Sequence, residues 1–169
     1  MKLYLDMDGV LADFHKAYYF DRVQDGSWDK IRFRTMVMEH KVFETLDFMP
    51  NTQILLNYVD DLVKNHGLEV EILTSVGTFN VEQGAEAQRQ KRNWLWAHGI
   101  LYKFNFVRTK SEKANYANPN SILIDDSSGC ILPFNEAGGH GILHDDKNYE
   151  YTLSKLKKIV FEHEHIQVD

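Results

Sequence analysis

Two aspartates lie two positions apart at the end of a short apolar segment near the start of the chain. The apolar segment covers residues 3–5, and Asp6, Asp8 and Gly9 follow it. Alternate residues of an extended chain point to the same side, so the two carboxylates are expected to point the same way. Such a pair could belong to a catalytic or metal-binding site, and the alternative is a turn capped by two surface aspartates.

Two further apolar segments end in polar side chains that could complete such a site. The first ends in Thr74 and Ser75, and the second ends in Asp125 and Asp126. Each pair alone is more often an ordinary strand end or an acidic turn. Because the carboxyl ends of parallel strands meet at one edge of a sheet, three such ends in one chain indicate a shared site.

Carboxylates gathered in this way require positive charge nearby. Asp6, Asp125 and Asp126 would concentrate negative charge that a cation must offset. Oxygen ligands of this kind suit a hard cation such as Mg²⁺, which commonly takes one or two carboxylates, waters and a substrate phosphate oxygen. The sequence therefore predicts a Mg²⁺ site, with hydroxyls such as that of Thr74 available as hydrogen-bond donors.

The elements that must position these residues alternate between short apolar segments and longer segments of helical period. This pattern is typical of an α/β protein with a Rossmann-like parallel sheet and helices on both faces. The expected strands are Leu3–Leu5, Val70–Leu73, Phe104–Val107, Ile122–Ile124 and, more weakly, Gly141–Leu143. The expected helices include one from about Ile54 that stops at Gly67, one that contains Ala87, Trp94 and Leu95 and runs to Gly99, and one near the carboxyl terminus around Leu153–Val160.

One segment breaks the alternation. Residues from about 19 to 50 mix aromatic and charged side chains without strong periodicity, and we interpret them as a small helical cap insertion above the carboxyl ends of the strands. The length of 169 residues suits one domain covering residues 1–169. No repeat or low-complexity segment is evident.

Composition limits the classes of partner. A net charge of −6 argues against binding long nucleic acid, which needs a basic face; only scattered candidates exist, namely Arg32, Arg34, Arg89, Lys91 and Arg92. A small anionic substrate remains compatible with this charge, because one metal ion and one lysine can reverse the field inside a pocket. The single Cys130 cannot form an internal disulfide, and neither a leader nor a membrane-spanning apolar run is evident, so we expect a soluble cytoplasmic protein.

Four elements, in their order along the chain, resemble the motifs of the haloacid dehalogenase (HAD) superfamily of phosphatases. Residues 6–10 (Asp-Met-Asp-Gly-Val) resemble its first motif, residues 72–75 (Ile-Leu-Thr-Ser) its second, and residues 122–127 (Ile-Leu-Ile-Asp-Asp-Ser) its acidic fourth motif. Lys113 stands where the family carries its phosphate-binding lysine, about a dozen residues before the acidic pair, and Lys110 is the alternative.

The resemblance implies a role for each matching residue. Asp6 would attack phosphorus to give an aspartyl-phosphate, and Asp8 would protonate the leaving alkoxide and then activate water. Thr74 and Lys113 would stabilise the transferring phosphoryl group, with help from Ser75. The implied Mg²⁺ ligands are Asp6, Asp8 through its backbone carbonyl, Asp125 and Asp126; which of the last two binds directly is left open.

Residues 6–14 more narrowly resemble the 5'(3')-deoxyribonucleotidases, in which the first motif runs into an aromatic residue of the nucleoside pocket, here Phe14. This implies hydrolysis of a nucleoside monophosphate to nucleoside and phosphate. Alternatives are a HAD phosphatase acting on a sugar phosphate or a nucleic-acid end, and a non-catalytic nucleotide-binding protein on the same fold. Homodimer formation is left open.

Overall fold

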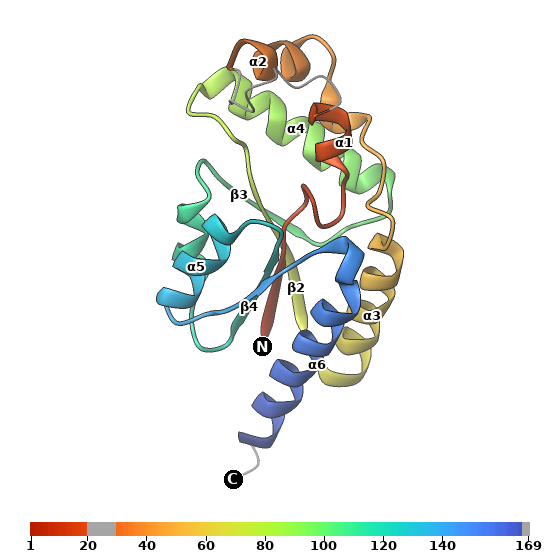
Figure 1. Ribbon diagram of the computed structural model, residues 1–169, viewed down its shortest axis with the longest axis vertical. Helices are drawn as coiled ribbons and strands as arrows, with labels where there is room; N and C mark the ends of the chain where they lie inside the picture. Colours follow the sequence, from red (N-terminus) through yellow and green to blue (C-terminus); the bar gives the residue numbers. More distant parts are fainter. Residues whose placement is uncertain (20–29, 167–169) are drawn as a thin grey trace.

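A five-stranded sheet in which all strands run parallel forms the centre of the molecule (Figure 1). The computed structural model describes residues 1–19 and 30–166. The strand order is β3-β2-β1-β4-β5, and the strands are β1 (Lys2–Leu5), β2 (Glu69–Ser75), β3 (Lys103–Val107), β4 (Ser121–Asp125) and β5 (His140–Leu143). The predicted α/β fold is thus confirmed, and each predicted strand is present with ends that differ by at most two residues.

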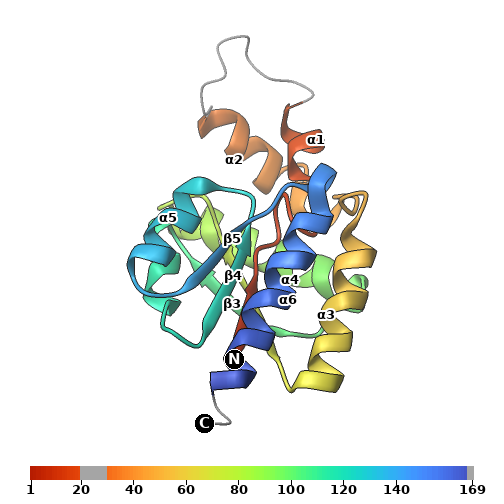
Figure 2. The same ribbon diagram turned by 60° about the horizontal axis from the view of Figure 1, so that its bottom comes forward.

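Helices cover both faces of the sheet because the strands bury apolar side chains on both sides. Leu3 and Leu5 of β1 belong to one core cluster, which also contains residues of α3 (Thr52–His66), α4 (Val81–Ala97) and α6 (Tyr149–Ile166). Tyr4 belongs to a second cluster with Phe134 of α5 (Ser128–Glu136) and partly buried residues of the 3-10 helix η2 (Ser111–Tyr116). Figure 2 shows α5 and α6 on opposite sides of the strands. This two-sided burial explains the continuous apolar character of the strands.

The helix boundaries agree with the sequence signals in most places. α3 ends at Gly67, which has a φ of 62° and donates its N–H to the carbonyls of Leu62 and Val63, so the predicted helix stop is confirmed. α4 begins after Asn80, whose side chain caps the N–H of Gln83. α5 was not predicted. Among residues 1–19 and 30–166, no helix is long and apolar enough to cross a membrane.

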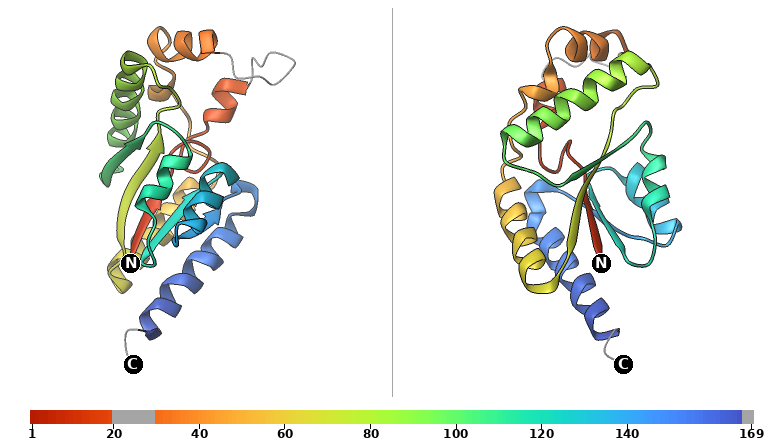
Figure 3. Two further views of the ribbon diagram at one scale, coloured as in Figure 1. Left: turned by 90° about the vertical axis from the view of Figure 1, so that its left-hand side faces the viewer. Right: turned by 180° about the vertical axis from the view of Figure 1, so that it is seen from behind.

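Helices of the segment expected to form a cap, together with the helix just before that segment, lie at the end of the sheet where the strands finish. α1 (Phe14–Tyr19), α2 (Lys30–Met38) and the 3-10 helix η1 (Val42–Glu44) lie at the end of the molecule opposite the carboxyl terminus (Figures 1 and 3). A short 3-10 helix, η3 (Asp146–Asn148), precedes α6. The predicted insertion of about residues 19 to 50 includes residues 20–29, which lie outside the described residues.

Buried side chains of α4 form hydrogen bonds with the backbone of the segment expected to form a cap, residues 30–50 as described. Gln90 donates from Nε2 to the carbonyl of Val37 (2.7 Å) and accepts from the N–H of Phe43 at Oε1 (3.2 Å). Trp94 donates its indole N–H to the carbonyl of Leu46 (2.7 Å). These bonds satisfy backbone groups that the irregular segment cannot satisfy by itself.

Replacing Gln90 by Met should therefore destabilise the protein although the change preserves side-chain size. The substitution leaves the Phe43 N–H and the Val37 carbonyl without these partners, which should lower the free energy of unfolding by about 2 to 4 kcal/mol. Urea unfolding checks this. Gln53→Met, at an exposed position of α3, is the control and should change stability by less than about 0.5 kcal/mol. Equal effects of the two substitutions would contradict the role of Gln90.

Candidate active site

The register of the central strands brings the three predicted strand ends to one edge of the sheet. Leu5 of β1 is paired with both Ile72 of β2 and Ile124 of β4, so the residues that follow these three positions lie side by side. The chain continues from β1 to β2 and β3 on one side and then crosses to β4 on the other side. Ligands of open parallel sheets bind at such a switch point, outside the carboxyl ends of the strands.

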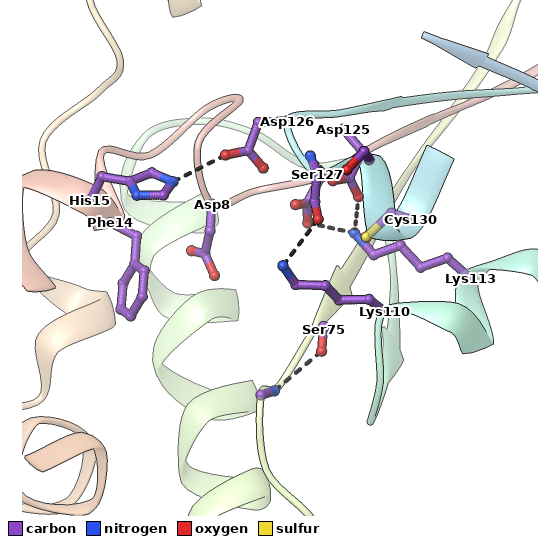
Figure 4. Close-up of a pocket in the computed structure, with 13 residues that line it drawn as sticks. Asp8, Phe14, His15, Ser75, Lys110, Lys113, Asp125, Asp126, Ser127 and Cys130 are labelled. Atoms are coloured by element: carbon purple, nitrogen blue, oxygen red, sulfur yellow. Dashed lines mark hydrogen bonds and ion pairs between the residues drawn. The ribbon is translucent and has the colours of Figure 1, made fainter. Parts of the chain in front are cut away.

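A cavity of about 370 Å³ opens at this edge (Figure 4). Every predicted site residue except Thr74 lines it. The lining residues are Asp6, Asp8, Phe14, His15, Ser75, Gly77, Lys110, Lys113, Asp125, Asp126, Ser127, Ser128 and Cys130. The structure therefore gathers residues from widely separated parts of the chain, between positions 6 and 130, into one pocket of the size that small ligands occupy.

Lys113 is the buried cation of this cavity. Its Nζ lies 2.9 Å from Oδ1 of Asp6 and donates to Oδ2 of Asp125 at 2.5 Å. Burial opposes the charged form of this lysine, but the charges of Asp6 and Asp125 outweigh burial and raise its pKa. Lys110, the alternative considered from the sequence, also lines the cavity, and its Nζ donates to the hydroxyl of Ser127 (3.0 Å). Of the two lysines, Lys113 is the one in contact with Asp6.

Three carboxylates in the cavity are arranged as a possible set of metal ligands. Asp6, Asp125 and Asp126 each offer an oxygen, and these oxygens lie within 4.8 Å of one another. Burial and the nearby charge of Asp6 raise the pKa of Asp125 to about 6, although Lys113 opposes the shift. A hard divalent cation would relieve this repulsion, and an all-oxygen donor set suits Mg²⁺.

Asp8 makes a different contact from the other carboxylates. Its Oδ2 accepts from Nζ of Lys91 at 2.6 Å, and its Oδ1 has no hydrogen-bond partner among the described residues. Burial raises the pKa of Asp8, and the charge of Lys91 opposes that shift. The side chain of Asp8 is thus paired with a lysine and is not one of the three clustered carboxylates.

Thr74 does not lie where its predicted role requires. Its side chain is fully buried and does not line the cavity, and its hydroxyl accepts a hydrogen bond from Lys91 (2.9 Å). The expected contact between this hydroxyl and a phosphate oxygen is therefore replaced by a contact with a buried lysine. Ser75, the next residue, lines the cavity, and its hydroxyl accepts from the N–H of Gly77 (3.2 Å).

Sequence reasoning missed Lys91 and His15. Lys91 was counted among scattered basic residues, yet it is 0% exposed. The missed signal is its spacing, because Gly84, Ala87 and Trp94 of α4 are also buried, so that Lys91 falls on the core face of the helix. His15 lies at the mouth of the cavity, where its Nε2 is 3.1 Å from Oδ2 of Asp126 and this hydrogen bond raises the pKa of the imidazole.

Phe14 lines the cavity as part of a stack of three aromatic rings. Its ring centroid is 5.3 Å from that of Tyr18 and 5.2 Å from that of Phe43, with interplanar angles of 19° and 16°. The stack joins α1 to η1 and gives one wall of the cavity an apolar character. Figure 4 shows Phe14 on the same side of the pocket as His15 and Asp8.

Gly9 allows the loop after β1 to approach the loop after β4. Its φ is 77°, and a Cβ atom at this position would lie 2.1 Å from Oδ2 of Asp126. The loop itself turns tightly, since the N–H groups of Leu11 and Ala12 both donate to the carbonyl of Met7 (2.9 Å each). The close approach of Asp126 to the first loop thus depends on a residue without a side chain.

Comparison with protein-family models finds no family that matches the chain, and comparison with curated proteins finds no match.

Because Asp126 lies so close to Gly9, Gly9→Ala should destabilise the protein more than the same change at another glycine of similar backbone conformation. Gly67 provides the control, because its φ is 62° and no atom lies within 4 Å of an added Cβ. Gly67→Ala should cost about 1 kcal/mol for the left-handed backbone alone, whereas Gly9→Ala should cost about 2 to 4 kcal/mol because Asp126 must also move. Chemical unfolding measures both. Adding Asp126→Ala to the Gly9 variant should recover part of the difference, and a failure to do so would rule out the contact as its cause.

Proposed function

We propose that this protein is a Mg²⁺-dependent phosphomonoesterase in which Asp6 is the nucleophile. The observation that carries the proposal is the position of Asp6 in the cavity, 2.9 Å from the ammonium of Lys113 and within a cluster of carboxylates able to hold a metal ion. A carboxylate between two sources of positive charge can approach a phosphate dianion. The resemblance of four sequence elements to the motifs of HAD phosphatases supports the same proposal.

The residues present fit Mg²⁺. Asp6, Asp125 and Asp126 supply oxygen ligands only, which is the chemistry that this ion prefers. When bound, the ion would neutralise charge on the phosphoryl oxygens and orient the phosphate for attack. Asp8 would contribute its backbone carbonyl to the ion, because its side chain already accepts a hydrogen bond from Lys91.

The protein's own residues would carry out two displacement steps. In the first, a carboxylate oxygen of Asp6 forms a bond to phosphorus while the bond to the leaving oxygen breaks, and Asp8 gives its proton to the departing alkoxide. In the second, Asp8 takes a proton from water, whose oxygen attacks phosphorus and releases inorganic phosphate and free Asp6. Lys113, with Ser75 and Lys110 at the cavity wall, would stabilise charge on the phosphoryl oxygens.

Cys130 also lines the cavity, but it would be a poor nucleophile. Its side chain is buried, and burial raises the pKa of the thiol. Nucleophilic attack requires the thiolate, so this group is inert at neutral pH. The thiol therefore does not compete with Asp6 as the nucleophile.

We infer that the substrate is a small phosphate ester, and we propose that it is a nucleoside monophosphate. A cavity of about 370 Å³ with Phe14 in its wall suits a phosphate attached to a flat apolar group. A nucleic-acid end would need a basic surface leading to the cavity. Two of the basic residues considered from the sequence do not supply one, because Lys91 is buried and Arg89 is paired with Glu44 and Glu86. A sugar phosphate is the remaining substrate class, and a non-catalytic nucleotide-binding role is the remaining alternative. Cytoplasmic location stays a prediction, and homodimer formation stays open.

Phosphate release from a panel of 5' and 3' nucleoside monophosphates and sugar phosphates tests the reaction. We expect turnover with Mg²⁺ and none with chelator, and Asp6→Asn should lower the rate by at least about 10³-fold because it removes the nucleophile. Asp61→Asn, at an exposed position of α3, should leave the rate unchanged. Unchanged hydrolysis by the Asp6 variant would refute the mechanism, and a wild-type protein that binds nucleotides without releasing phosphate would favour the non-catalytic alternative.

Thermal unfolding with and without Mg²⁺ tests the metal site independently of activity. An ion that binds only the folded protein stabilises it by about 2.7 kcal/mol at a hundred times its dissociation constant, so Mg²⁺ should raise the melting temperature. Asp126→Asn should weaken this effect, whereas Asp47→Asn, which alters an exposed aspartate paired with Lys16, should not. Equal stabilisation of all three proteins by Mg²⁺ would show that the ion binds elsewhere.

A further inference from the structure

Lys91 is a lysine enclosed in the core of the molecule. Its side chain is 0% exposed, and it comes from α4, outside the strand ends that supply the carboxylates. Its Nζ donates to Oδ2 of Asp8 (2.6 Å), to the hydroxyl of Thr74 (2.9 Å) and to the carbonyl of Ser75 (2.8 Å). The ammonium also lies 4.6 Å from the centroid of the Phe43 ring.

These contacts use all the hydrogen-bonding capacity of the ammonium. A lysine has three N–H donors and no acceptor, and each donor has a partner within the protein. Lys91 also does not line the cavity. It is therefore not placed to bind a phosphate, in contrast with Lys110 and Lys113, and its effect on the site must pass through the groups it holds.

We propose that Lys91 is a positioning residue that fixes the carboxyl group of Asp8 for proton transfer to the leaving group. This inference rests on the phosphatase function proposed above. The ammonium can only donate, so Oδ2 of Asp8 must remain an acceptor. Because Oδ1 is buried and has no hydrogen-bond partner among the described residues, Lys91 supplies the hydrogen bond that holds this carboxyl group.

The same contacts fix Asp8 relative to β2. The bonds from Lys91 to Thr74 and Ser75 anchor the ammonium to the carboxyl end of that strand, so Asp8 is held by a group whose own position is set by the sheet. This explains the fully buried position of Thr74, whose hydroxyl orients the lysine instead of contacting substrate. Catalytic groups gain from such support because small displacements cost large factors in rate.

The test uses the leaving group to separate proton donation from other effects. Release of p-nitrophenolate needs no proton, whereas release of an alkoxide from a nucleoside monophosphate does. Rapid-mixing measurements should follow formation of the phosphorylated enzyme from p-nitrophenyl phosphate and from the best nucleoside monophosphate of the panel. We expect Lys91→Met to slow phosphorylation by the nucleotide by about 100-fold, and by p-nitrophenyl phosphate by less than about threefold.

A double-mutant cycle adds a readout that a merely structural role would not move. If Lys91 acts through Asp8, Lys91→Met should cost less than about threefold in an Asp8→Asn background, because the group it positions is already gone. The double variant also removes both charges of the buried pair, which favours folding over the single lysine change. Circular dichroism and thermal unfolding verify that each variant is folded.

Thr74→Val provides a second route in case Lys91→Met does not fold. It removes one anchor of the ammonium and should slow phosphorylation by the nucleotide by about three- to tenfold, again with little effect on p-nitrophenyl phosphate. Equal slowing with both substrates, or a full effect of Lys91→Met in the Asp8→Asn background, would overturn the inference while leaving the phosphatase function intact. Absence of phosphate release by the wild-type protein would instead overturn the proposed function and this inference with it.

Discussion

Mutual repulsion among four carboxylates at one edge of the sheet is the constraint on which the rest of the site depends. Asp6, Asp8 and Asp125 lie at or just beyond the ends of adjacent strands, and Asp126 follows directly. Charges this close in a partly buried place repel strongly. Two buried lysines offset the repulsion, with Lys113 between Asp6 and Asp125, and Lys91 against Asp8.

The two lysines divide the carboxylates into groups with different chemistry. Lys113 faces the cavity and leaves Asp6, Asp125 and Asp126 close enough to share a cation. Lys91 approaches from α4 and pairs with Asp8, whose side chain is not part of that group. The proposed function gives Asp8 a separate task as an acid–base residue. Pairs of carboxylates with distinct environments commonly have distinct roles in catalysis. The fold thus gives the carboxylates different surroundings through the direction from which each cation arrives.

The sheet and most residues of the candidate site could be predicted from the sequence, because both leave signals in short stretches of it. Strands buried on both faces are continuous apolar runs, and the polar residues that end them are visible as such. α5 was missed because Gly129 and Pro133 interrupt its pattern. The roles of Thr74 and Lys91 could not be predicted because they depend on a contact between β2 and α4, and a lysine on a helix is exposed by default. The spacing of Lys91 with Ala87 and Trp94 was the available clue.

The order of the charged residues along the chain has a consequence for how the site is assembled during synthesis. The contacts that build it join distant positions: 83 residues separate Lys91 from Asp8, and 111 separate His15 from Asp126. Such contacts form late in folding because long loops must close first. Both lysines precede Asp125 in the chain, so a growing polypeptide already contains its two neutralising cations when the last acidic pair leaves the ribosome. Asp125 and Asp126 therefore join Asp6 and Asp8 only in a chain that already contains both lysines.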